Sequence, residues 1–149
     1  MGILFAVSLA ALSLGITTPV FAEILHFTAH LDGASETPPN STKASGRAEL
    51  ALDTEAKTLT WQVSYSGLSG PVTMAHFHGP AARGVAAGVV VGLSGGLTSP
   101  VTGRAALNDG QIGDLRAGLW YLNLHTLLNP SGEIRGQLTA VKPDPKTAP

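Results

Sequence analysis

The chain contains no cysteine, and only 13% of its residues are charged and 5% aromatic. The absence of cysteine excludes disulfides, thiolate metal sites and cysteine nucleophiles, and with them a blue-copper centre, which needs a cysteine ligand. The formal net charge of −1 excludes the strongly basic surface that is typical of nucleic-acid binding, so no nucleic-acid partner is expected. Apolar burial and hydrogen bonds must therefore stabilise the fold on their own.

Charged side chains are also absent from residues 1–22. Ile3 to Leu14 form an almost unbroken apolar run, and Val20-Phe21-Ala22 has short side chains at the two positions that signal peptidase reads. We predict a signal peptide over residues 1–22 and a periplasmic or secreted protein. No Lys or Arg precedes the run, which leaves a retained anchor as the alternative. Cleavage is favoured because the run is shorter than the roughly 20 residues of a spanning helix, and no membrane span is expected after it.

Turn-forming residues are frequent, with 18 glycines and 10 prolines, and the segments between them alternate polar and apolar residues. This period of two is typical of half-buried β-strands, and it is clearest over 25–31, 47–52 and 59–65. Further strands are predicted over 72–78, 89–93, 101–107, 119–126 and 133–141, with one helical turn within 109–118. We therefore expect an all-β fold, an antiparallel Greek-key-like β-sandwich of about seven to eight strands. It forms a single domain over residues 23–141, followed by a disordered tail over 142–149.

Two tryptophans and two histidines are best explained by the sheet itself. Trp61 and Trp120 share the strand parity of their apolar neighbours, so both are predicted to lie in the core. His26 and His30 lie on the polar side of the first strand, so we expect them to face solvent. No binding role is assigned to any of the four.

Glu36 and Glu133 are the carboxylates that an acid–base hydrolase would require, and both lie in predicted turns. Nothing in the sequence brings them together. Glu36 is expected to bond main-chain amides of its own loop, and Glu133 is expected to pair with Arg135 or with a neighbouring strand. An enzyme of this type is therefore not favoured, and no catalytic residue is assigned.

Three segments carry a combination of motifs that is more informative than any one of them. They are Met74-Ala-His-Phe-His-Gly-Pro-Ala81, Trp120-Tyr-Leu-Asn-Leu-His-Thr126 and Asn129-Pro-Ser-Gly-Glu-Ile-Arg-Gly-Gln-Leu138. With Phe27-Thr-Ala-His-Leu31 and Glu36-Thr-Pro-Pro39 before them, they resemble the CHRD (chordin) domain over about Leu25 to Leu138. Such domains occur in secreted bacterial proteins and in an extracellular developmental regulator that binds growth factors. The resemblance therefore implies an extracellular binding module with an extracytoplasmic protein partner, and it implies no activity.

A histidine cluster is the clearest chemical feature that the sequence predicts. His76 and His78 are separated by one residue in a predicted strand, so both side chains point to one face and can bind one metal ion. His125, near the end of another predicted strand, is the candidate third ligand. Three neutral imidazoles with an open position suit copper or zinc, and copper is the first choice because its intrinsic affinity is higher. Met74 shares the parity of His76 and His78, and its thioether would suit Cu(I).

Three functions remain open for this cluster. The first is an exported CHRD-type binding module that holds copper, or zinc as the second choice, at His76, His78 and His125. The second is a structural or protein-interaction domain without metal, in which the same rings bond loop carbonyls and fix the strand ends. The third is a copper-dependent redox enzyme, since the His-x-His pair and the later strand histidine are similar to the layout in copper–zinc superoxide dismutases. The bridging histidine and zinc loop of those enzymes are not found in this sequence, which favours a binding module over an enzyme.

Overall fold

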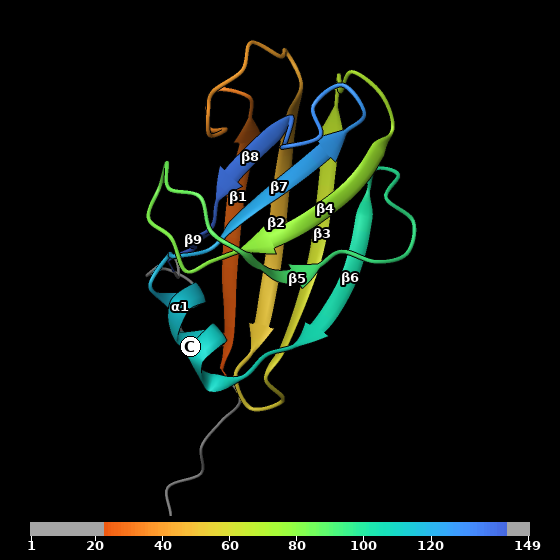
Figure 1. Cartoon of the computed structure of the whole chain (residues 1–149). Helices are drawn as coiled ribbons and strands as arrows, with labels where there is room; N and C mark the ends of the chain where they lie inside the picture. The colour runs from red at the N-terminus through yellow and green to blue at the C-terminus, as the bar shows by residue number, and fades with distance from the viewer. Residues whose placement is uncertain (1–22, 143–149) are drawn as a thin grey trace, which may run out of the picture.

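The computed structural model describes residues 23–142 (Figure 1). The predicted signal peptide, residues 1–22, lies outside the described residues, and so do residues 143–149 of the predicted tail. The described part is an all-β antiparallel domain with one short helix, as the alternation predicts. In this part of the chain, no helix has the length and apolar character needed to cross a membrane.

The strands follow the predicted order. They are β1 (Ile24–Asp32), β2 (Ser45–Asp53), β3 (Thr58–Ser66), β4 (Val72–His78), β5 (Val89–Gly92), β6 (Val101–Ala106), β7 (Tyr121–Thr126), β8 (Ile134–Gln137) and β9 (Thr139–Ala140), with helix α1 (Asp109–Arg116) before β7. The predicted strand over 133–141 is split, because after β8 the chain leaves β7 and β9 pairs with β1. The predicted strand over 119–126 begins only at Tyr121, since Leu119 donates its main-chain N–H to the carbonyl of Asp114 and closes the end of α1.

The strands form one sheet, hydrogen-bonded in the order β5-β4-β7-β8-β1-β2-β3-β6, with β9 beside β1. Figure 1 shows how this sheet folds over itself: β5, β4, β7 and β8 form one layer, and β1, β2, β3 and β6 form the layer behind it. The layers are connected where Arg135 of β8 pairs with Asp32 at the end of β1. The predicted antiparallel sandwich is thereby confirmed, with eight strands on the path and the two-residue β9 off it.

The core lies between the two layers and holds the inward side chains of the long strands. Trp61 and Trp120 are both buried in it, as predicted. Phe77 contacts both indoles, with ring centroids 5.3 Å from Trp61 and 6.2 Å from Trp120. Each indole also packs against a glycine, because a Cβ atom at Gly103 would overlap Trp61 and one at Gly79 would overlap Trp120. Apolar burial of this kind is the main stabilising contribution available to a domain without disulfides.

Candidate metal centre

The outward face of β4, β7 and β8 carries mostly polar side chains in register. Its cross-strand rows are Met74–His125, His76–Asn123–Arg135 and His78–Tyr121–Gln137. The alternate residues of β4 and β7 face the core. All 6 residues of β7 are nevertheless buried, the outward ones included. Outward therefore does not mean solvent-exposed on this part of the sheet.

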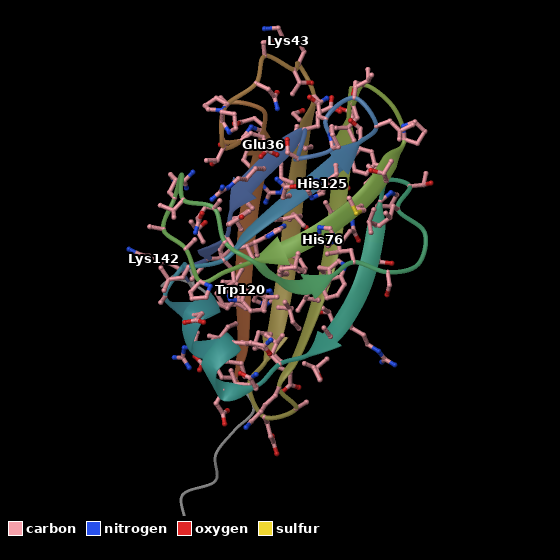
Figure 2. The ribbon with its side chains drawn as sticks, in the orientation of Figure 1. Glu36, Lys43, His76, Trp120, His125 and Lys142 are labelled. Atoms are coloured by element: carbon pink, nitrogen blue, oxygen red, sulfur yellow. The ribbon has the colours of Figure 1, made fainter. Side chains whose placement is uncertain are left out.

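Two loops cover this polar face, and its side chains bind them. Asn123 donates to the carboxylate of Glu36 in the β1–β2 loop, at 2.8 Å. Arg135 donates to the Thr37 hydroxyl in the same loop at 2.9 Å, and to the Val85 carbonyl in the β4–β5 loop at 2.8 Å. The face is thus a second buried layer, held together by polar contacts instead of apolar packing. Figure 2 shows His76 and His125 on this side of the molecule, with Glu36 in the loop above them.

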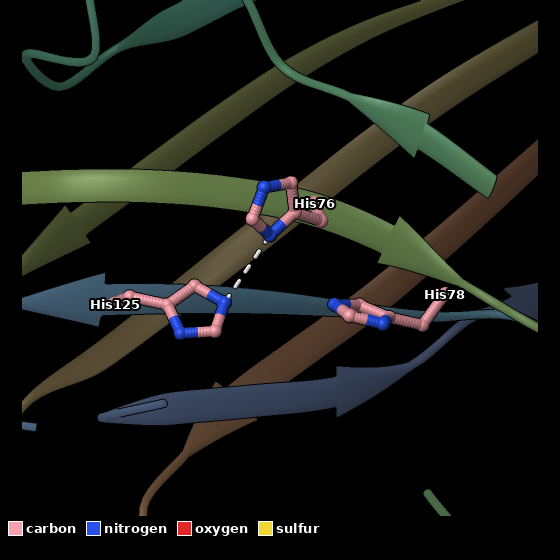
Figure 3. Close-up of side chains that lie close together, drawn as sticks. All are labelled: His76, His78 and His125. Atoms are coloured by element: carbon pink, nitrogen blue, oxygen red, sulfur yellow. Dashed lines mark hydrogen bonds between the residues drawn. The ribbon is translucent and has the colours of Figure 1, made fainter. Parts of the chain in front are cut away.

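The structure brings His76, His78 and His125 together, and the shared face of His76 and His78 is the part that their spacing predicts. Each ring offers one nitrogen, and the three nitrogens lie within 4.8 Å of one another. His76 Nδ1 lies 3.3 Å from His125 Nε2, and Figure 3 shows the three rings converging. A tetrahedral metal bound about 2.0–2.1 Å from each nitrogen would hold the nitrogens about 3.3 Å apart. Because the 4.8 Å limit exceeds this spacing by about 1.5 Å, the most distant pair has to approach by up to that amount when a metal binds.

Hydrogen bonds to loop carbonyls fix the protonation of two of these rings. His78 Nδ1 lies 3.0 Å from the carbonyl oxygen of Ala87, and His125 Nδ1 lies 3.0 Å from that of Pro130. Because a carbonyl only accepts, each neutral ring carries its proton on Nδ1 and has its lone pair on Nε2. His78 Nε2 is buried, and no residue in the described range 23–142 forms a hydrogen bond with it. A ring nitrogen left free while the other is held by an outer contact is the usual arrangement of a metal ligand.

All three imidazoles favour the neutral form. Desolvation by burial lowers the pKa of His76, His78 and His125 below the ordinary value for histidine. His76 lowers the pKa of His78 further, and His76 and His78 lower that of His125, while the positive charge of Arg135 also lowers the pKa of His78. Neutral imidazole is the form that binds a metal ion, so burial prepares these side chains as ligands.

Arg135 and Tyr121 support the cluster from the side of β8. The guanidinium carbon of Arg135 lies 3.4 Å from the centroid of the Tyr121 ring, which is a cation–π contact. The Tyr121 ring in turn stacks on His78. Neither residue stands out in the sequence as part of a site. The sequence shows only that polar residues alternate with other residues in two segments, and the structure pairs these segments as β7 and β8.

Glu133 is fully buried and has its own set of hydrogen-bond donors. Its carboxylate accepts from the Ser69 N–H and hydroxyl, the Thr126 hydroxyl and the Thr42 hydroxyl, at 2.6–2.9 Å. Burial raises the pKa of Glu133, but these bonds outweigh it and lower the pKa to about 2. Of the two partners expected for this residue, the neighbouring strand is confirmed through Thr126, and pairing with Arg135 is wrong because Arg135 binds the covering loops instead.

Glu36 is the second buried carboxylate, and it occupies a different site. Burial raises its pKa to about 7, against the lowering effects of the Thr37 N–H, Arg135 and Asn123. The N–H of Thr37 in its own loop is among the groups that lower this pKa, and the hydrogen bonds to the carboxylate come from Asn123 of β7. Because Glu36 and Glu133 each have separate partners, the two carboxylates do not form the pair that acid–base hydrolysis requires.

The remaining histidines of the described chain lie elsewhere. His26 and His30 are exposed on β1, as the alternation predicts. His30 lies 3.7 Å from Asp32, also at the surface, and neither histidine belongs to the cluster.

Comparison with known proteins identifies one family. The sequence model of the CHRD domain family matches residues 27–138. This range covers most of the chain and includes all three clustered histidines. No curated protein and no solved structure gives a significant match.

Proposed function

Because the chain belongs to the CHRD domain family, we propose that it is an exported binding module that holds a copper ion, or zinc as the second choice, through His76, His78 and His125. The observation that carries this proposal is the buried Nε2 of His78, which has no partner in the described part of the chain. A buried polar atom without a partner costs about 1–3 kcal/mol. A metal ion shared with His76 and His125 would offset that cost.

Copper is preferred to zinc on intrinsic affinity. For a given set of nitrogen ligands, the affinity of divalent metals reaches its maximum at copper. The three rings lie on two adjacent strands of one sheet, so the ligand positions are set by the register of β4 and β7 and not by a mobile loop. Sites built on strands hold their geometry more accurately than sites on loops, which favours tight binding.

Export is supported by the sequence at the N-terminus. Residues 1–22 have the apolar run and the small-residue ending of a signal peptide. The CHRD resemblance implies the same location, periplasmic or secreted, and a protein partner outside the cytoplasm. In this proposal the partner contacts either the bound metal ion or the surface of the domain.

A second candidate function is a structural or protein-interaction module without metal. The observation that favours it is that His78 and His125 each bond a loop carbonyl, at Ala87 and Pro130, with no ion required. In that case the cluster serves to fix the β4–β5 loop and the β7–β8 turn. Removal of metal would then leave the stability of the domain unchanged.

Metal content and metal titration separate the two functions. The chain is purified without an affinity tag, its metal is measured by mass spectrometry, and it is titrated with Cu(I), Cu(II) and Zn(II). We expect close to one equivalent of copper in the wild-type protein and none in the His76→Ala/His78→Ala variant. The matched control is His26→Ala/His30→Ala, which removes two exposed histidines from β1 and should bind as the wild type does.

Two results would contradict the proposal. One is a wild-type chain that carries no metal and shows no submicromolar binding. The other is an unchanged metal content in the His76→Ala/His78→Ala variant. Circular dichroism of each variant tests whether the variant is folded, so that a loss of metal caused by unfolding is recognised.

A further inference from the structure

Met74 carries the sulfur atom that lies in the strand row next to the histidines. It is directly opposite His125 in the antiparallel pair of β4 and β7, and residues in this relation have Cβ atoms about 4.5–5.5 Å apart on one face. Its side chain has three rotatable bonds and is 46% exposed, so it is free to turn toward the ring of His125.

Met74 shares the outward face of β4 with His76 and His78, and a bulge in β4 lies just before it. Val72 pairs with Thr126 and Met74 pairs with His125, so β4 has one residue more than β7 in this stretch. Strict alternation would put Val72 and Met74 on the same face, but Val72 packs against the core while Met74 is exposed. The extra residue, Thr73, donates its hydroxyl to the His125 carbonyl at 3.3 Å. Bulges commonly redirect a side chain next to a functional site, and this one turns Val72 toward the core while Met74 stays outward beside His125.

The charges around the cluster disfavour a divalent ion. The three histidines are uncharged ligands, and no carboxylate belongs to the cluster within the described residues. The guanidinium of Arg135 lies 3.4 Å from the centroid of the Tyr121 ring, which stacks on His78, so its positive charge also opposes a cation at the site. Coulomb repulsion is proportional to the charge of the ion. It is therefore twice as large for Zn(II) or Cu(II) as for Cu(I).

We infer that Met74 is the fourth ligand and that the site selects Cu(I) over Zn(II) and Cu(II). This inference rests on the proposed function, because it takes His76, His78 and His125 as the other three ligands. A thioether is a soft ligand that suits Cu(I) and adds little to the binding of Zn(II). Four protein ligands leave no open position for a substrate, so the site fits a Cu(I) carrier or buffer and not a redox enzyme.

The variant Met74→Leu tests the sulfur, because leucine preserves the volume of methionine and lacks the thioether. The full chain is titrated without oxygen against a coloured Cu(I) chelator, and separately with Zn(II) against a fluorescent zinc chelator. We expect the Cu(I) affinity to fall by about tenfold or more, since even the loss of an outer contact costs this much. The Zn(II) affinity should stay unchanged. A copper–sulfur contribution to the X-ray absorption spectrum should be present in the wild type and absent in the variant.

The control is Leu127→Ala, which removes another exposed apolar side chain, two residues after His125, that contains no sulfur. It should leave both affinities unchanged. Equal Cu(I) affinity in Met74→Leu and the wild type overturns the inference and leaves the three-histidine site intact. A parallel loss of Cu(I) and Zn(II) affinity also overturns it, because the sulfur would then have no selective role. A wild-type chain that binds neither ion overturns the proposed function itself, and the inference with it.

Discussion

Tyr121 lies face to face on His78, with ring centroids 4.8 Å apart and an angle of 2° between the ring planes. Both residues also bond to the main chain of Ala87. The Tyr121 hydroxyl accepts the N–H of Ala87 at 3.0 Å, and His78 Nδ1 donates to the Ala87 carbonyl at 3.0 Å. The stacked ring fixes the plane of the imidazole, and the bond to the Ala87 carbonyl fixes its rotation. His78 is therefore oriented before any ligand arrives, which reduces the entropy lost on binding.

The variants Tyr121→Phe and Tyr121→Leu separate these two contacts. Phenylalanine keeps the stacked ring and loses the bond to Ala87, so we expect metal affinity near that of the wild type and a free energy of unfolding about 1–2 kcal/mol smaller. Leucine also loses the stacked ring, so we expect its metal affinity to fall about tenfold below that of the wild type. Metal titration and chemical unfolding measure the two effects. Equal metal affinity in the two variants would show that the stacked ring does not position His78.

A second prediction concerns the buried carboxylate of Glu133. Glutamine at this position has one acceptor oxygen in place of two, and it loses the charge that strengthens bonds from Ser69, Thr126 and Thr42. We expect Glu133→Gln to lower the free energy of unfolding at neutral pH by about 2–3 kcal/mol. The pKa of Glu133 is lowered from its ordinary value of 4.5 to about 2. The extra stability of the wild type over the variant is therefore fully present at pH values above 4.5 and is lost as the pH falls toward 2.

Chemical unfolding of both proteins at neutral pH and at acidic pH checks this prediction. The difference in unfolding free energy should narrow as the pH is lowered from the ordinary pKa of Glu133 toward the folded value. An exposed carboxylate, Glu55, provides the control, since Glu55→Gln should alter stability little at either pH. A difference that stays constant with pH would show that the ionised form of Glu133 is not what the hydroxyls stabilise.

The fold was predictable because nearly every strand alternates polar and apolar residues and ends at a turn. The same property predicted that His76 and His78 share a face, since a strand repeats every two residues. This inference depends only on local periodicity, which a single sequence displays. His125 was predicted as the third ligand from its place near the end of a strand, and its approach to His76 depends on the pairing of β7 with β4, which periodicity does not give.

The covering of the polar face could not be predicted in this way. Asn123 lies on the outward side of β7, where alternation predicts a solvated residue, yet it is buried because it binds Glu36, 87 residues earlier in the chain. Contacts over such a separation leave no periodic signal. The bulge at Thr73 was equally hidden, since strict alternation assigns Val72 and Met74 to one face and the structure separates them.

The third prediction concerns Glu36, whose titration links the covering loop to stability. The side chain is 6% exposed, and both carboxylate oxygens accept from Asn123 Nδ2, at 2.8 and 3.0 Å. Burial raises the pKa from the ordinary value of 4.5 to about 7. Between these two values the folded state binds more protons than the unfolded state. Stability therefore falls as the pH rises through this window, and the loss is complete once the pH exceeds the folded pKa.

The variant Glu36→Gln keeps the shape of the protonated side chain and cannot ionise. We expect it to match the wild type in unfolding free energy at the acidic end of the window and to be more stable above the folded pKa, by up to about 3 kcal/mol, since each pKa unit corresponds to about 1.4 kcal/mol. Urea unfolding of the metal-free proteins across this pH range measures the difference, with Glu55→Gln again as the exposed control. A variant that is less stable than the wild type at the alkaline end would mean that the ionised carboxylate is held by Arg135 and stabilises the loop, so that the direction of the pKa shift would be reversed.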